Sequence, residues 1–114
     1  LGIGGAWNVP LTCHWLALSR KALGPEFPLV ATNGAQDWRD VARMMLAGGH
    51  AVQMSSAVMM RGPDVLSDAI AGLDAYLASR SMTAADLVGR AADACRSFAE
   101  MPLRQENWKT YVTQ

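Results

Sequence analysis

The sequence predicts an α/β fold, because a strand, a helix and a second strand follow one another between positions 28 and 54. Residues 28–32 and 51–54 are apolar runs with the length of buried parallel strands, and they are too short for helices. Residues 37–46, between them, carry apolar side chains at helical spacing. Two strands joined through a helix form a parallel βαβ unit.

The helix of this unit has start and stop signals. Asp37 stands at the expected N-cap position, and Gly48-Gly49 follows the last apolar residue. One apolar face is expected to consist of Val41, Met44 and Met45. A solvated charged face is expected to consist of Arg39, Asp40 and Arg43.

A polar turn leaves each predicted strand. Asn33-Gly34 follows the first strand and tolerates positive φ, and Ser55-Ser56 follows the second strand with small hydroxyl side chains. The carboxyl ends of neighbouring parallel strands lie at one edge of a sheet. The two turns therefore predict a concavity of N–H donors suited to a phosphate group.

Three further helical segments are expected around the unit. The first runs from Pro10 to about Leu23, with an apolar stripe made of Leu11, Trp15, Leu18 and Ala22. The second begins near Asp64, with a stripe made of Leu66, Ile70, Leu73 and Leu77. The third begins at a Thr83 cap, with the acidic Asp86 at its third position, and continues through Leu87, Ala91, Ala94 and Phe98.

Composition narrows the function classes. The chain has 114 residues, of which 51% are hydrophobic, and its formal net charge is zero, so there is no electrostatic case for a nucleic acid or an anionic membrane. No apolar run approaches the ~20 residues that a membrane span needs. Leu1 is not Met and opens no signal peptide, so we expect the chain to begin within a longer protein.

The two cysteines predict neither a disulfide nor a metal site. Cys13 and Cys95 lie far apart in helical patterns, without a CxxC motif or a nearby histidine cluster. We expect both to be free, buried thiols of a cytoplasmic protein, and no metal ligands are assigned.

Residues 29–58, LVATNGAQDWRDVARMMLAGGHAVQMSSAV, resemble the end of the FMN-binding barrel of the dihydroorotate dehydrogenase and dihydropyrimidine dehydrogenase family. That family has a Gly-Gly turn after strand seven. Its strand eight contains Val-Gln, and a small residue with a Ser or Thr then holds the flavin phosphate. Residues 2–10, GIGGAWNVP, are similar to the family's Gly-rich loop after strand six. RGPDVLSDAIAGLDAYL and MTAADLVGRA are similar to its closing helix and tail.

The resemblance implies a fold class and a cofactor. The fold is the C-terminal portion of a (β/α)8 TIM barrel, about strands seven and eight with the surrounding helices, over residues 1–98, followed by a tail over 99–114. The cofactor is FMN, and the residues implied to bind it are Gly4, Gly5, Asn33, Gly34, Ser55 and Ser56. Two positions depart from the family, because Asn33 replaces its first Gly and Ala35 replaces a branched apolar residue.

The implied function is an FMN-dependent oxidoreductase that acts on a dihydropyrimidine, such as dihydroorotate or dihydrouracil. The family's catalytic Ser or Cys lies in middle loops that match nothing here, so no catalytic residue is expected in this chain and the base would lie upstream of Leu1. A whole barrel takes ~250 residues, so the N-terminal barrel half is an expected partner, and a homodimer is left open. Neither a nucleic acid nor a membrane is expected as a partner.

Two other function classes are compatible with the residues alone. One is a different phosphate-binding barrel that uses the same turns on a phosphorylated substrate. The other is a small non-catalytic α/β module that folds by itself.

Several remaining residues are expected to have structural roles. Gln53 is expected to be a hydrogen-bonded interior amide, and His50 is expected at the amino end of its strand, away from the site. Trp38 and Trp108 are expected as surface or interface anchors. Core packing is expected for Met44, Met45, Met54, Met59 and Met60.

Overall fold

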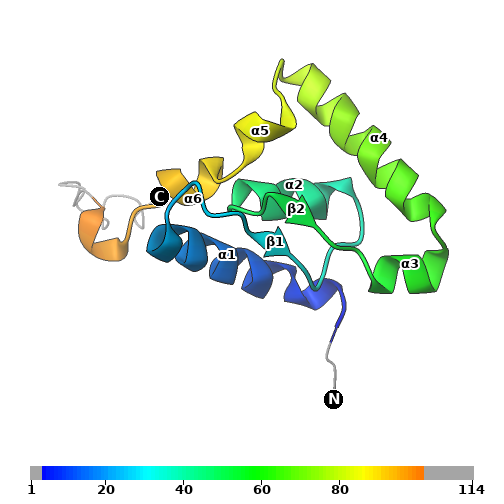
Figure 1. Cartoon of the computed structure of the whole chain (residues 1–114), viewed down its shortest axis with the longest axis horizontal. Helices are drawn as coiled ribbons and strands as arrows, with labels where there is room; N and C mark the ends of the chain where they lie inside the picture. The colour runs from blue at the N-terminus through cyan, green and yellow to red at the C-terminus, as the bar shows by residue number, and fades with distance from the viewer. Residues whose placement is uncertain (1–3, 102–114) are drawn as a thin grey trace, which may run out of the picture.

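The computed structural model of the chain describes residues 4–101, which form a helix-rich α/β unit (Figure 1). Its two strands, β1 (Val30–Ala31) and β2 (Ala51–Val52), are parallel. The longer helices are α1 (Val9–Leu23), α2 (Trp38–Leu46) and α4 (Asp64–Ser79). The shorter ones are α3 (Ser56–Arg61), α5 (Ala84–Leu87), α6 (Arg90–Ala94) and the 3-10 turns η1 (Ala6–Asn8) and η2 (Phe98–Glu100).

The predicted βαβ unit is confirmed, with shorter strands than the apolar runs suggested. Val30 pairs with Ala51, and Ala31 pairs with Val52. The His50 N–H donates to the Leu29 carbonyl at 2.7 Å, and the Leu29 N–H donates to Nδ1 of His50 at 3.1 Å. His50 therefore extends the pairing at the amino end of β2, which agrees with its expected structural position.

Helix α2 begins and ends at the residues that the sequence marked. The Asp37 carboxylate accepts from the N–H groups of Arg39, at 2.8 Å, and Asp40, at 3.3 Å. Partial burial raises the pKa of Asp37, but these hydrogen bonds lower the pKa by more than burial raises it, so the pKa lies below its usual value. At the other end, the N–H of Gly48 donates to Met45 and the N–H of Gly49 donates to Met44, which closes the helix.

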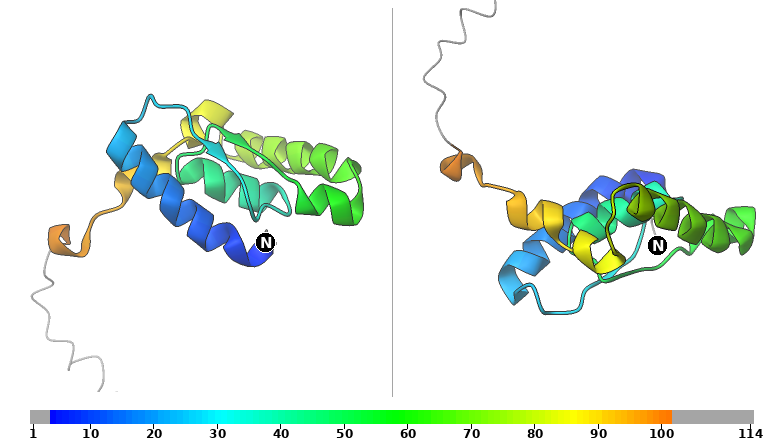
Figure 2. Two further views of the ribbon diagram at one scale, coloured as in Figure 1. Left: turned by 60° about the horizontal axis from the view of Figure 1, so that its bottom comes forward. Right: turned by 90° about the horizontal axis from the view of Figure 1, so that it is seen from above.

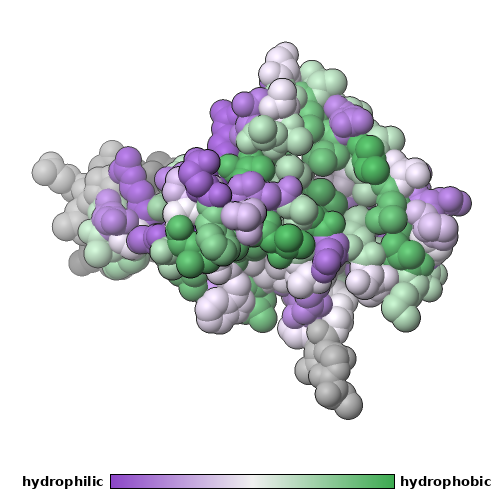
Figure 3. All heavy atoms as spheres, in the orientation of Figure 1, coloured by the Kyte–Doolittle hydropathy of each residue, from purple (hydrophilic) through white to green (hydrophobic). Residues whose placement is uncertain are grey.

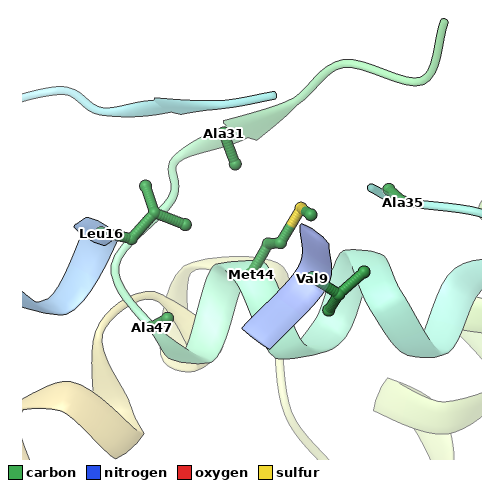
Figure 4. Packing of buried hydrophobic residues seen from close by; sticks show 6 residues of the cluster. All are labelled: Val9, Leu16, Ala31, Ala35, Met44 and Ala47. Carbon is green, nitrogen blue, oxygen red and sulfur yellow. The ribbon is translucent and has the colours of Figure 1, made fainter. Parts of the chain in front are cut away.

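Helix α2 is buried on two sides and forms the centre of the unit (Figure 2). Met44 is fully buried in a cluster with α1 and the sheet, as Figure 4 shows for Val9, Leu16, Ala31, Ala35, Met44 and Ala47. A second cluster joins α2 to α4 and α5 through Ala42, Met45, Leu77 and Leu87. The expected core positions of Met44 and Met45 are confirmed, whereas Met59 and Met60 are more than 80% exposed.

The predicted stripe of α1 was wrong in phase. Leu11, Trp15, Leu18 and Ala22 are all exposed, and the buried residues are Val9, Leu16 and Arg20. The helix is apolar on more than one face, so spacing alone cannot choose the face that meets α2 and β1.

The predicted stripe of α4 was correct only at its C-terminal end. Leu77 is buried and Leu73 is partly buried, but Leu66 and Ile70 are exposed while Val65 and Ala69 face inward. Figure 3 shows hydrophobic side chains gathered along the α4 side of the molecule. Trp38 packs on α4 at Gly72 and stacks on Tyr76 with ring centroids 5.5 Å apart, so it anchors α2 within the unit.

The third predicted helix is broken into α5 and α6. Its Thr83–Asp86 capping box is present, but Gly89 has a φ of 74° and separates the two short helices. The Gly89 N–H donates to the Met45 carbonyl at 2.8 Å, so contact with α2 bends the chain here. Phe98 is 92% exposed and lies outside α6.

A buried arginine fixes α6 against α1. Both Arg20 Nε and Nη2 donate to the Asp93 carboxylate, at 2.7 and 2.8 Å, and Nη1 donates to the Pro25 carbonyl at 3.1 Å. Arg20 lies in the last turn of α1 and thus also has a tertiary partner. Its guanidinium lies on Gly89, where any Cβ would overlap it.

Both cysteines are free, as expected, but they are not both buried. Cys13 is half-buried between α1 and α2, and burial raises the pKa of its thiol, while Cys95 is exposed. No helix within residues 4–101 is long and apolar enough to cross a membrane. Trp108 and the tail from residue 102 onward lie outside the described residues.

Replacing Gly72 by Ala should destabilise the protein, although this change usually stabilises a helix interior by about 1 kcal/mol. The new Cβ would overlap the indole of Trp38, and overpacking typically costs ~1–3 kcal/mol. Thermal unfolding measures the effect. In a Trp38→Ala background, Gly72→Ala should become neutral or stabilising, and a stabilising effect beside an intact Trp38 would contradict this packing.

Asp93→Asn should lower stability at neutral pH and reduce the sensitivity of stability to acid. The hydrogen bonds from Arg20 hold the pKa of Asp93 below its usual value. A depressed carboxyl pKa stabilises the fold above the unfolded pKa of about 3.9, and this contribution is lost as pH falls through the folded value.

Because Asp93 is half exposed, we expect a loss of about 1 kcal/mol at pH 7. Chemical denaturation at pH 7 and pH 3 measures it, with the exposed Asp74→Asn on α4 as a matched control. An equal loss at both pH values would disprove the ion-pair contribution.

Candidate functional site

The turn after β1 has the backbone conformation that its residues predicted. Asn33 has a φ of 76° and Gly34 has a φ of 128°. A Cβ on Gly34 would lie 2.9 Å from the backbone nitrogen of Val9, so this position also needs Gly because α1 approaches it closely.

Residues at and just before the start of α1 hold this turn in place through hydrogen bonds. The Thr12 hydroxyl donates to the Asn33 carbonyl at 2.8 Å. The buried Asn8 amide donates to Oδ1 of Asn33 at 3.2 Å, so the Asn33 side chain is held toward α1. The asparagine that departs from the family's glycine therefore has a structural contact of its own.

The turn after β2 leads directly into α3. Ser55 is the N-cap residue and Ser56 is the first helical residue. Within residues 4–101, the N–H groups of Gly34, Ala35, Ser55 and Ser56 have no backbone acceptor. The two turns thus carry hydrogen-bond donors that remain available to a ligand.

A pocket of about 340 Å³ lies where the two turns meet. It is lined by Gly4, Thr32, Asn33, Gly34, Ala35, Gln53, Ser55 and Ser56. The predicted site residues are therefore brought together, apart from Gly5. Gly5 instead precedes η1 with a φ of 119°, and its carbonyl accepts from the Asn8 N–H at 3.1 Å.

Gln53 was expected in the interior, but it is exposed and lines the pocket. Strand β2 ends at Val52, so Gln53 belongs to the turn, and its N–H still donates to the Ala31 carbonyl at 2.8 Å. The signal that could have found it is its place at the carboxyl end of a strand, beside the serines.

Gln36 joins the two turns and was not singled out from the sequence. Its Nε2 lies 3.3 Å from the Gly34 carbonyl and 3.1 Å from Oγ of Ser56. The Arg61 guanidinium of α3 donates to the Gln36 carbonyl.

Asp40, which was expected on a solvated face, is buried instead. Its carboxylate accepts from the Gln36 N–H at 3.0 Å and from Nη1 of Arg43 at 2.7 Å. A surface role was wrong because the turn folds back over the first turn of α2 and needs an acceptor there.

The pocket is chemically suited to bind rather than to catalyse proton transfer. Its lining supplies backbone N–H groups, hydroxyls and amides, and residues 4–101 contribute no carboxylate, histidine, cysteine or lysine to it. Within the described part of the chain, no group of three or more acidic, histidine or cysteine side chains could hold a metal ion. Neutral donors converging on one cavity favour an anionic group such as a phosphate.

The chain is similar in sequence to dihydroorotate dehydrogenases and to a dihydropyrimidine dehydrogenase subunit. The chain is 32% identical over 69 residues to the catalytic subunit of dihydroorotate dehydrogenase B (NAD(+)) from Methanothermobacter thermautotrophicus, a match that covers 60% of this chain and 23% of that protein. It is 31% identical over 55 residues to the NAD-dependent dihydropyrimidine dehydrogenase subunit PreA of Escherichia coli, covering 48% of this chain and 13% of that protein. The chain matches no protein-family model.

A solved structure shares the fold. The ligand-free DHODH of Eimeria tenella superposes with a TM-score of 0.73 at 20% sequence identity, over 78% of this chain and 25% of that one. The chain thus corresponds to a quarter or less of each of these proteins. As the resemblance of its motifs predicted, the chain is related in sequence to the dihydroorotate and dihydropyrimidine dehydrogenases.

Proposed function

We propose that this chain supplies the flavin phosphate site of an FMN-dependent oxidoreductase that acts on a dihydropyrimidine. The observation that carries the proposal is the pocket at the carboxyl ends of two parallel strands, where two turns present N–H groups without a backbone acceptor among residues 4–101. The kinship with dihydroorotate and dihydropyrimidine dehydrogenases supplies the substrate class.

The residues present fit a phosphate group. Gly34, Ser55 and Ser56 offer backbone N–H groups, and the serines add hydroxyls. Gly4, which has no side chain, also lines the pocket, and a Cβ there would lie 3.7 Å from Oδ1 of Asn33. A volume of about 340 Å³ is at the lower end for a ligand pocket. It suits the phosphate end of a cofactor whose remaining part extends beyond this chain.

FMN, when bound, accepts a hydride from the substrate. The residues of this chain would bind and orient its phosphate. We place the base that removes the substrate proton in another part of the protein, because residues 4–101 bring no group of suitable chemistry to the pocket.

We further propose that β1 and β2 are strands seven and eight of a (β/α)8 barrel, over residues 1–98, with 99–114 as a tail. Support comes from an open groove of about 380 Å³ between α1 and β1. Leu11, Trp15 and Val30 line this groove and are each at least half exposed. An N-terminal barrel half would cover these side chains and pair with the free edge of β1.

Ser56→Asp should weaken FMN binding by roughly 100-fold in the purified full-length protein that contains this chain. A carboxylate within a few Å of the phosphate dianion at an intermediate dielectric opposes it by ~3 kcal/mol or more. Aspartate can still accept from Gln36, so the fold should persist. Flavin fluorescence titration measures the affinity. The control is Ser67→Asp, which adds the same charge to an exposed position of α4. Unchanged stoichiometric FMN in the Ser56→Asp protein would refute this site.

Residues 1–114 expressed alone should be inactive and should self-associate, because the apolar face of α1 and the edge of β1 would be uncovered. Analytical ultracentrifugation measures the self-association, and binding of a fluorescent dye specific for apolar surface measures the uncovered face. Replacing Leu11 and Trp15 by Gln should reduce the association. A monodisperse monomer with a cooperative thermal transition would contradict the missing barrel half.

A further inference from the structure

Gln36 is the one side chain in the described part of the chain that bonds both turns of the pocket. It follows the turn after β1, and its amide nitrogen reaches Gly34 within that turn and Ser56 at the start of α3. The proposed function as stated uses only the residues that line the pocket, and Gln36 is not one of them.

The orientation of this amide is determined by its neighbours. The Gly34 carbonyl can only accept a hydrogen bond, so the Gln36 atom 3.3 Å from it must be the NH₂ group. The same NH₂ group lies 3.1 Å from Oγ of Ser56. Ser56 Oγ is therefore an acceptor toward Gln36.

A hydroxyl that accepts from one side has its own hydrogen left to donate elsewhere. For Ser56 the open side is the pocket that its residue lines. Donation by the amide also polarises the O–H bond and makes it a better donor to an anion. We propose that Gln36 is a positioning residue that turns the Ser56 hydroxyl into a hydrogen-bond donor toward the flavin phosphate. This inference rests on the proposed function.

The backbone of Gln36 is held firmly enough for this role. Its N–H donates to the buried Asp40 carboxylate at 3.0 Å, and its carbonyl accepts from Arg61. Arg61 is the last residue of α3, the helix that begins at Ser56, so this contact also holds that helix against the turn after β1. Gln36 thereby sets the separation of the two turns as well as the polarity of the hydroxyl.

The test uses the ratio of FMN affinity to riboflavin affinity, because riboflavin lacks the phosphate. Gln36→Met keeps the length of the side chain and removes the donor, and it should weaken FMN roughly tenfold while riboflavin binding stays unchanged. Gln36→Glu should weaken FMN roughly 100-fold, because a carboxylate accepts the Ser56 hydroxyl hydrogen and adds a negative charge. Should Gln36→Met not fold, Gln36→Glu replaces it in the double-mutant cycle below, where the part of its FMN loss that acts through the Ser56 hydroxyl should disappear in the Ser56→Ala protein.

A double-mutant cycle identifies the route. In a Ser56→Ala background, Gln36→Met should cause no further loss of FMN, whereas in a Ser56→Thr background, which keeps a hydroxyl, the loss should return. Ser67→Met, which places the same side chain at an exposed position of α4 outside the pocket, is the control and should leave the ratio of FMN to riboflavin affinity unchanged.

Two results would overturn the inference. Equal weakening of FMN and riboflavin by Gln36→Met would mean that the residue only supports the fold. An undiminished Gln36→Met effect in the Ser56→Ala protein would mean that it does not act through the hydroxyl. Failure of the proposed function is distinguishable, because the unmodified protein would then bind FMN no better than riboflavin and Ser56→Asp would change nothing.

Discussion

The structure depends on the burial of α2 on two sides at once. Met44 enters the cluster formed with α1 and β1, while Ala42 and Met45 enter the cluster formed with α4 and α5. A helix nine residues long has little stability of its own in water, so these two contacts must stabilise it. The positions of α1 and α4 are in turn defined by the faces of α2 that they cover.

The same helix connects the core to the candidate site. Asp37 caps α2, and Asp40 in its first turn holds the backbone of Gln36, so the turn after β1 is a continuation of a rigid element. The Gln36 side chain then reaches Ser56 at the start of α3. Donors placed in this way lose little freedom when a ligand binds, which favours a site for a group of fixed geometry such as a phosphate.

Exposed apolar side chains lie on two sides of the unit, one on α1 and the other on α3 and α4. On α1, Trp15 is 60% exposed and lines a groove together with Val30 of β1. On the α3 and α4 side, Met59 and Ile70 are exposed as well. Exposed large apolar side chains on two sides of the unit favour contact with a partner or with a further part of the same protein. It is the physical basis for proposing a larger barrel around these residues, alongside the partial match to the dehydrogenases.

Local chemistry determined much of this protein from the sequence alone. The Asp37 cap, the Thr83–Asp86 capping box, the Gly stop of α2 and the positive φ at Asn33 each depend on a few adjacent residues, and all were predicted. The two parallel strands and the gathering of the turns at one edge followed from the order of these elements.

Only the tertiary structure decided which faces are buried and which polar groups meet. α1 carries apolar residues on several faces, and the choice among them is made by α2. Gly89 breaks a helix because its N–H donates to the Met45 carbonyl. Arg20 is buried in contact with Asp93, which lies 73 positions further along the chain. Gln36 and Ser56 are likewise brought into contact by the fold, from positions 20 apart in the sequence. Such contacts join segments distant in sequence, and their free energy depends on desolvation and packing, which the spacing of residues along a chain does not contain.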